Sequence, residues 1–217
     1  MKKINKIYFY KVKVDNGGAP CVCDSVLTLA ICKRGIRSTA RENDWIIGFG
    51  GKNLKEKLIY IAQVTKKLLN GEYYKSEKYF KRPDCIYRWD DEKQKYYWVN
   101  GKKYHLNGLK LDDDLDKGKA IVLMSTKYTY FGDIGTSKYK EKYPEIRKSI
   151  EVLTQGHRVN HSTKLFNELI SLIRESIVLE IEGKPTHQVS DISCGYNSMR
   201  KKVAICRDKT DVQTKEF

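Results

Sequence analysis

The stretch that indicates the fold class is Ile7-Tyr8-Phe9-Tyr10-Lys11-Val12-Lys13-Val14. Its tyrosines and valines at even positions fall on one face, and its lysines at odd positions fall on the other. A period of two residues is typical of a half-buried β-strand. The run Asn-Gly-Gly-Ala-Pro at residues 16–20 then breaks the pattern. We therefore expect an N-terminal strand with one face against a core.

Working outward from this stretch, short apolar or alternating runs predict many further strands. They lie at residues 26–31, 45–49, 58–68, 85–89, 96–99 and 120–125. Between them, the Arg-rich residues 33–43 predict a single helical turn, and the acidic run 112–116 predicts a solvated loop.

Two helices are predicted near the C-terminal end. Pro144 opens the first, which extends to Leu153. Ser162 or Thr163 caps the second. Its core face carries apolar residues at helical spacing, namely Leu165, Leu169, Leu172, Ile173 and Ile177.

Together these elements predict an α+β protein. Many short strands in mostly antiparallel order favour a closed or nearly closed β-barrel, because closure removes exposed strand edges. We expect the C-terminal helices to pack on this barrel. Residues 1–183 should form a single domain, with residues 184–217 as an extension that is weakly structured or docked.

Composition restricts the class of protein further. Hydrophobic residues make up 40% of the 217 residues, which excludes a fully disordered chain. No run approaches 18 consecutive apolar residues, and the basic N-terminus lacks the apolar run of a secretory peptide. These features predict a cytoplasmic protein that does not contact a membrane.

The net charge of +15 is uneven along the chain. Residues 1–110 hold 24 basic and 11 acidic side chains, a balance of +13. Such a field is typical of a protein that binds a polyanion, with nucleic acid the first candidate. The alternative is an AT-rich coding sequence, since 32 of the 42 basic residues are Lys.

Six cysteines are present, at residues 21, 23, 32, 85, 194 and 206. Cys21 and Cys23 with Cys32 offer three thiols, but their spacing is C-x-C and no C-x-x-C pair completes a zinc site. We expect free thiols, no metal and no cofactor.

Several spaced elements resemble a known family. These are the turn at residues 15–20, the strand end at 27–33, the pair Ile36-Arg37, and the element Asp44-Trp45-Ile46-Ile47-Gly48. Together with Tyr128–Gly132 and Gly156-His157-Arg158, they resemble the second type of nucleotide-modification-associated domain. Residues 43–49 and 60–65 are also similar to the core of pseudouridine-synthase-like barrels. The resemblance implies a role in nucleic-acid modification or phage defence, with partner proteins of such a system.

The candidate binding residues form a basic cluster and a set of aromatic faces. Arg side chains suit phosphate because their parallel donors match two oxygens, and stacking suits bases. Alternatively, the cluster is a solvated loop and the aromatic residues belong to the core. The candidates are Lys33, Arg34, Arg37, Arg41, Trp45 and Tyr130, with His157 and Arg158 from the resemblance.

Two residues are candidate catalytic groups. Asp15, at a Gly-rich break, would accept a proton or read a base edge, or else only bond its own turn. Cys32 lies beside cationic residues that would lower the pKa of its thiol, or else it is an inert buried thiol. His105, His157 and His161 are separate in sequence, and a Cys32–His157 dyad requires the fold to join them.

These features predict that the protein binds nucleic acid or a nucleotide, plausibly with a modified base. One alternative is an enzyme that acts on a nucleotide or base through Asp15 or Cys32. Another is a protein-interaction module.

Overall fold

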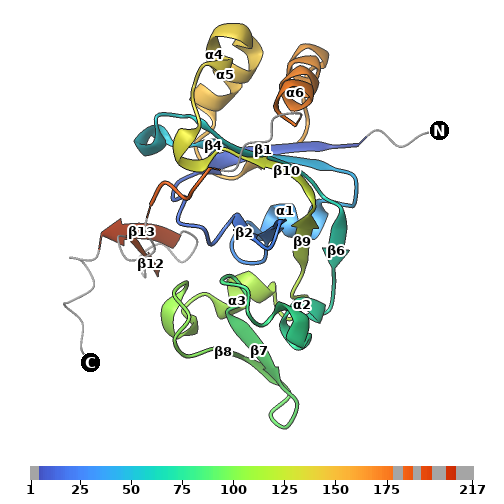
Figure 1. Ribbon diagram of the computed structural model, residues 1–217, viewed down its shortest axis with the longest axis vertical. Helices are drawn as coiled ribbons and strands as arrows, with labels where there is room; N and C mark the ends of the chain where they lie inside the picture. Colours follow the sequence, from blue (N-terminus) through green and yellow to red (C-terminus); the bar gives the residue numbers. More distant parts are fainter. Residues whose placement is uncertain (1–4, 178–182, 188–191, 197–203, 209–217) are drawn as a thin grey trace.

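A computed structural model describes residues 5–177, 183–187, 192–196 and 204–208, the last two ranges as backbone only. The elements are stacked in layers (Figure 1). Three helices lie on one side of a five-stranded sheet. A four-stranded sheet lies on its other side, followed by a third layer of a hairpin and short helices. No helix in the described part of the chain is long and apolar enough to cross a membrane.

The five-stranded sheet has the order β10-β5-β4-β1-β11. Strands β1 and β4 run parallel, with Ile7 beside Trp45, and the other neighbours are antiparallel. The strands are β1 (Ile7–Val12), β4 (Trp45–Gly50), β5 (Leu58–Gln63), β10 (Lys127–Tyr130) and β11 (His157–Arg158).

Strand β1 is buried on both faces, so the prediction of a half-buried strand was wrong. Ile7 and Phe9 pack into the core on the helical side. Tyr8 and Tyr10 pack into a second core on the opposite side. Side chains of β1 do alternate between two faces, as predicted, but other layers of the protein cover both faces of this sheet.

The helical layer confirms the prediction for the C-terminal helices. Helix α5 (Pro144–Val152) begins at the expected proline. Helix α6 (Thr163–Ser176) is capped by Ser162, whose hydroxyl accepts from the Leu165 amide at 3.3 Å. The short α4 (Tyr139–Lys142) completes the layer. The core face of α6 is Leu165, Leu169, Leu172 and Ile173.

The four-stranded antiparallel sheet has the order β2-β3-β9-β6. Its strands are β2 (Cys21–Cys23), β3 (Val26–Leu29), β9 (Val122–Ser125) and β6 (Lys66–Leu68). The single strand predicted at 58–68 is therefore two strands, β5 and β6, in different sheets. Helix α1 (Arg34–Thr39) follows β3, where one helical turn was predicted.

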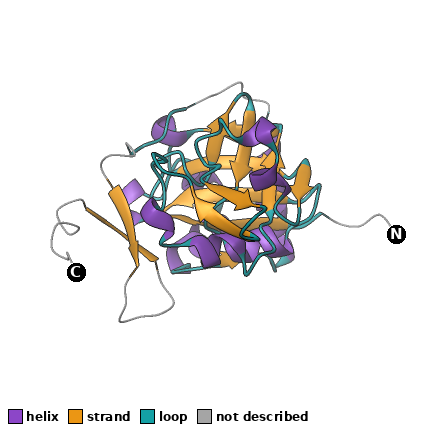
Figure 2. Ribbon diagram, turned by 90° about the horizontal axis from the view of Figure 1, so that it is seen from below, coloured by secondary structure: helices purple, strands orange, loops and turns teal. Residues whose placement is uncertain are grey.

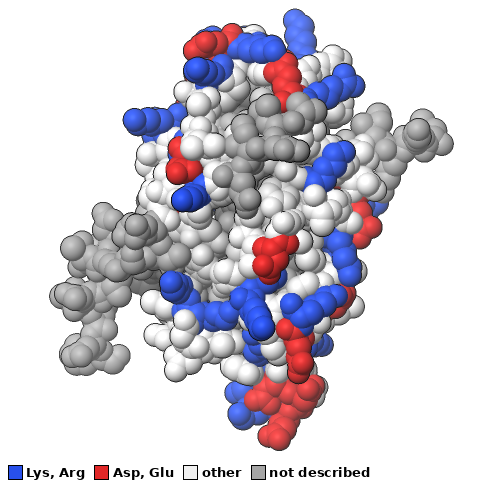
Figure 3. Space-filling view, in the orientation of Figure 1, with Lys and Arg blue, Asp and Glu red and all other residues white. Residues whose placement is uncertain are grey.

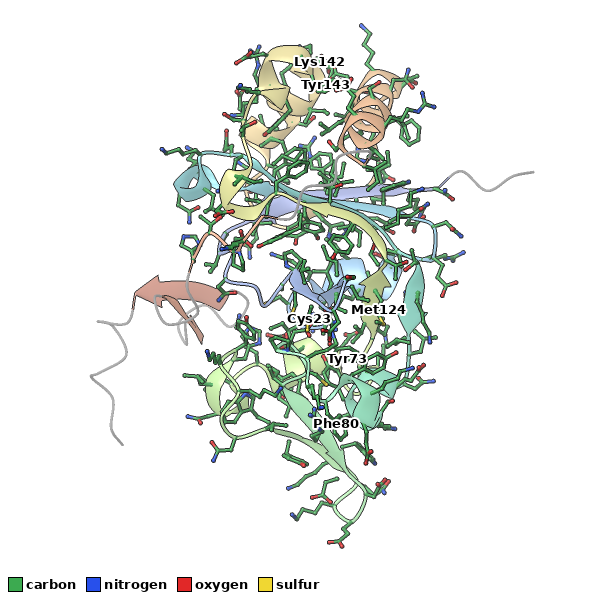
Figure 4. The ribbon with its side chains drawn as sticks, viewed as in Figure 1. Cys23, Tyr73, Phe80, Met124, Lys142 and Tyr143 are labelled. Atoms are coloured by element: carbon green, nitrogen blue, oxygen red, sulfur yellow. The ribbon has the colours of Figure 1, made fainter. Side chains whose placement is uncertain are left out.

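The third layer is formed by residues that lie between β6 and β9 in the chain. It has a tyrosine-rich core containing Tyr73, Tyr74 and Tyr87, and Figure 4 shows Tyr73 and Phe80 below Cys23 and Met124 of the sheet. Its elements are α2 (Glu72–Lys75), α3 (Leu111–Leu115) and the predicted hairpin β7 (Tyr87–Asp90) and β8 (Lys95–Trp98).

The remaining elements are 3-10 turns at Lys52–Leu54, Glu77–Tyr79, Leu106–Gly108 and Gly132–Ile134, and the pair β12 (Ile192–Tyr196) and β13 (Ala204–Asp208).

The α+β class is confirmed, but the predicted closed barrel is wrong. The described strands form four separate sheets and none of them closes on itself. Viewed from the side of the third layer, the strands overlap in stacked layers with helices around them (Figure 2). Helices and a second sheet cover the faces of the large sheet, so apolar burial does not require closure.

Candidate active site

A strained connection joins strand β3 to helix α1. Ala30 and Ile31 are buried, and the next two residues, Cys32 and Lys33, have φ values of 56° and 44°. Non-glycine residues rarely adopt this left-handed conformation, and such positions concentrate at functional sites. The turn leaves Cys32 half-buried at the junction of strand and helix.

Two residues from the third layer meet Cys32 at this turn. The Cys32 Sγ lies 3.4 Å from His105 Nε2. The other ring nitrogen, His105 Nδ1, lies 2.5 Å from Asp114 Oδ2. His105 is 6% exposed and Asp114 is 1% exposed. A thiol, an imidazole and a carboxylate therefore form one continuous chain of contacts.

The Asp114 carboxylate is fully engaged by the protein. Its Oδ1 accepts from the Cys32 amide at 2.7 Å, and its Oδ2 also accepts from the Tyr87 hydroxyl at 2.7 Å. Burial acts to raise the pKa of Asp114. The hydrogen bond and charge of His105, with the bonds from Cys32 and Tyr87, outweigh burial and hold that pKa below its usual value. Asp114 is thus ionised at neutral pH.

An ionised carboxylate fixes the proton on the imidazole. Because Asp114 accepts at Nδ1, the neutral ring carries its proton there. The Nε2 lone pair then faces the Cys32 thiol and is placed to accept its proton. A nucleophile, a base and a group that orients the base are the three parts of a nucleophilic catalytic site.

The same three groups also offer ligand atoms that lie within 4.8 Å of one another, as a metal site would. Asp114 bonds Nδ1 of His105 whereas Cys32 contacts Nε2, so a metal ion held at Nε2 would have Cys32 and His105 as its ligands from this group and Asp114 would only orient the ring. Structural zinc sites use four protein ligands and catalytic ones three. The arrangement therefore favours a nucleophile over a metal centre.

The residues of the basic cluster predicted from the sequence lie in different environments, some buried and some exposed. Arg37 is 1% exposed and donates to three backbone carbonyls. Arg34 is exposed and pairs with Asp113 at 3.5 Å, and Arg41 is exposed. The Lys33 ammonium lies 4.5 Å from the centre of the Tyr10 ring. Lys33 and Arg34 thus adjoin Cys32, whereas Arg37 is part of the interior.

The second candidate carboxylate, Asp15, lies in a buried cluster of its own. Its Oδ1 accepts from the Tyr130 hydroxyl at 2.5 Å, so the structure brings these two predicted residues together. Its Oδ2 accepts from the amide and hydroxyl of Thr186 at 3.1 and 3.0 Å. No contact described in this structure joins Asp15 directly to Cys32. Asp15 therefore holds the segment 183–187 against the domain.

The remaining predicted residues lie on the five-stranded sheet. Trp45 is in the core on the helical side. The His157 ring packs 5.7 Å from the Tyr8 ring, and Arg158 beside it is exposed. A Cβ added at Gly35 would lie 3.1 Å from the His157 ring, so His157 adjoins α1. The histidine that contacts Cys32 is nevertheless His105, not His157.

Sequence reasoning missed the roles of His105 and Asp114. Asp114 was read as part of a solvated acidic loop, but it lies on a short helix and is buried. A signal was present, because Leu111, Asp114 and Leu115 share one helical face through their spacing of three and four residues. His105 stands in a polar segment with no comparable pattern.

Fold and site together define a layered α+β protein with a Cys–His–Asp constellation at a strand-to-helix turn. The family model of nucleotide modification associated domain 2 matches residues 4–192, and the chain belongs to this family. The resemblance to this domain family that was inferred from the sequence is thereby confirmed. No curated protein and no solved structure matches the chain.

Proposed function

We propose that this protein is a cysteine-dependent enzyme that acts on a nucleotide or nucleobase in a modification system. One observation carries the proposal: Cys32, His105 and Asp114 form an ordered thiol–imidazole–carboxylate chain at a strained turn. The nucleotide class of the substrate is supported by the family to which the chain belongs.

The chemistry begins with transfer of the Cys32 proton to His105 Nε2. The thiolate sulfur then attacks an electrophilic carbon of the substrate, and an S–C bond forms as the bond to the leaving group breaks. His105 returns its proton to the leaving group. Water or a second substrate next attacks the same carbon and loses its proton to His105. The S–C bond breaks, and the departing thiolate of Cys32 takes the proton back from His105. No oxidant or reductant is needed.

Asp114 and Tyr87 support these steps without taking part in proton transfer. The Asp114 carboxylate stabilises the imidazolium that forms when His105 holds the proton. The Tyr87 hydroxyl donates to the same carboxylate and helps to keep it ionised. His105 and Asp114 are both buried, so water does not weaken the interaction between the imidazolium and the carboxylate.

A phosphate-bearing substrate at the Cys32 turn would meet Lys33 and Arg34, of which Arg34 also pairs with Asp113 and Asp116. Lys33 and Arg34 follow Cys32 directly in the chain. By contrast, the face in Figure 3 carries basic side chains interspersed with acidic ones. The surplus of +13 in residues 1–110 is thus not gathered into one patch on this face.

Thiol reactivity tests the proposal directly. An unperturbed thiol has a pKa of about 8.5 and is a poor nucleophile at pH 7. We expect iodoacetamide at pH 7 to alkylate Cys32 at least about tenfold faster than Cys23, as resolved by peptide mass spectrometry. Cys23 is a fitting control, because burial and its hydrogen bond to Asp24 raise the pKa of that half-buried thiol.

Variants then connect reactivity to function. His105→Gln should remove the fast alkylation, and Cys23→Ser should leave it unchanged. Incubation with labelled nucleotides should give a covalent adduct on the unsubstituted chain that Cys32→Ser lacks. Equal reactivity of Cys32 and Cys23, or tightly bound zinc whose removal exposes Cys32, would contradict the proposal.

A further inference from the structure

Arg37 is one of the most deeply buried large side chains in the described part of the chain, at 1% exposure. Its guanidinium donates three hydrogen bonds, all to backbone carbonyls. Nε donates to Cys32 O at 2.6 Å, Nη1 to Ile121 O at 2.6 Å and Nη2 to Asp114 O at 2.7 Å. A buried charge usually has an ionised partner, but within the described residues Arg37 has no carboxylate at ion-pair distance.

The carbonyl of Cys32 is distant in sequence from those of Asp114 and Ile121. Cys32 carries the thiol, Asp114 carries the carboxylate, and Ile121 directly precedes strand β9. One planar side chain therefore fixes the backbone of two members of the constellation relative to each other. The distances from Cys32 to His105 and from His105 to Asp114 depend on that backbone.

We propose that Arg37 is a positioning residue for the Cys32–His105–Asp114 site, an inference that rests on the proposed function. The rigid fork of Arg presents several donors at fixed angles, which the single ammonium of Lys does not reproduce. In this role Arg37 contacts neither the thiol nor the substrate.

Arg82 provides a matched control in the neighbouring layer. It is also buried, at 5% exposure, and donates to the carbonyls of Cys23 and Val26 at 2.7 and 3.1 Å. It differs in that it pairs with Asp84 and bonds no member of the constellation. Loss of either guanidinium should destabilise the fold, but only loss of Arg37 should change the reactivity of Cys32.

The experiment measures the iodoacetamide rate of Cys32 between pH 5 and 9 in the unsubstituted chain, Arg37→Lys, Arg37→Met and Arg82→Met. For Arg37→Met we expect the pH profile of the Cys32 rate to differ from that of the unsubstituted chain. We also expect a rate loss at pH 7 on the order of 100-fold, as for a misplacement of about 1 Å. Arg37→Lys should recover part of this loss. Arg82→Met should lower the thermal midpoint and leave the pH profile unchanged.

A second measurement covers the case in which the Arg37 variants do not fold. In the unsubstituted chain labelled with ¹⁵N-arginine, the Arg37 Nε resonance should shift with the same midpoint as the Cys32 rate, while that of Arg82 should not. A fast-reacting Cys32 with no response to either Arg37 test overturns this inference alone. A Cys32 no more reactive than Cys23 in the unsubstituted chain overturns the proposed function and this inference with it.

Discussion

Two buried carboxylates in this molecule share a design and differ in their neighbours. Asp114 and Asp15 are each 1% exposed, and each accepts from a buried tyrosine hydroxyl. Asp114 then contacts an imidazole that faces a thiol, whereas Asp15 contacts the backbone and hydroxyl of Thr186. A buried, hydrogen-bonded carboxylate is therefore no sign of catalysis by itself. Its role depends on whether the next group can accept and return a proton.

The largest expected effect comes from Asp114→Asn. The amide can donate to His105 Nδ1 and thereby place the imidazole proton on Nε2, where it no longer accepts from Cys32. In a comparable triad this substitution lowers turnover about 10⁴-fold, and we expect a loss on the order of 10³–10⁴-fold in adduct formation. Stopped-flow or quenched adduct assays measure it. A loss below tenfold would remove Asp114 from the site.

Asp15→Asn provides the opposite half of the comparison. It should leave the alkylation rate of Cys32 unchanged while lowering the free energy of unfolding by about 1–3 kcal/mol, because one buried acceptor becomes a donor. Urea unfolding with the same thiol assay separates the two quantities. If nucleotide affinity or turnover falls while stability is kept, Asp15 is a functional residue, as the sequence suggested.

The two tyrosines sharpen the comparison further. Tyr87→Phe should lower Cys32 reactivity roughly tenfold, a change of about 1.4 kcal/mol and within the range for a hydrogen bond to a charged group. Tyr130→Phe should lower the free energy of unfolding about as much as Tyr87→Phe does, and it should leave the alkylation rate of Cys32 unchanged. Alkylation and urea-unfolding assays of both variants test whether the hydrogen bonds of Asp114 and those of Asp15 act independently.

The smallest effect is a pH dependence of stability. The folded pKa of Asp114 is lowered, so its contribution to stability is present above the unfolded value of about 3.9 and is lost as pH falls through the folded pKa. The difference in unfolding free energy between the unsubstituted chain and Asp114→Asn should therefore shrink below about pH 4. Urea titrations from pH 3 to 7 measure it, and a constant difference would contradict the lowered pKa.

Much of the fold could be predicted from local patterns. The cap at Ser162, the proline at Pro144 and the hairpin at residues 87–98 are signals carried by neighbouring residues. The pairing of β1 with β4 in parallel, and the separation of β5 from β6, depend on contacts between distant segments. Periodicity carries no information about such partners, which is why a barrel was expected where stacked sheets occur.

Only the part of the candidate site that depends on neighbouring residues could be predicted from the sequence. Cys32 was identified because its neighbours are cationic, a local feature. The partner His105 was not, because 73 positions separate it from Cys32. Arg37 was expected to bind a ligand phosphate, but its three donors bond the chain's own carbonyls, and no local pattern indicates those partners.

Strands β6 and β9 are antiparallel neighbours, yet residues 69–121 lie between them. This excursion has its own tyrosine core and delivers both His105 and Asp114. The thiol of Cys32 and the two groups proposed to act on its proton thus lie in separate blocks of the chain. A family member in which a tight turn replaced the excursion would keep both sheets, helices α5 and α6 and the cysteine, but it would lack a base. Under the proposed function such a chain would be an inactive homologue, recognisable from the length of this single insertion.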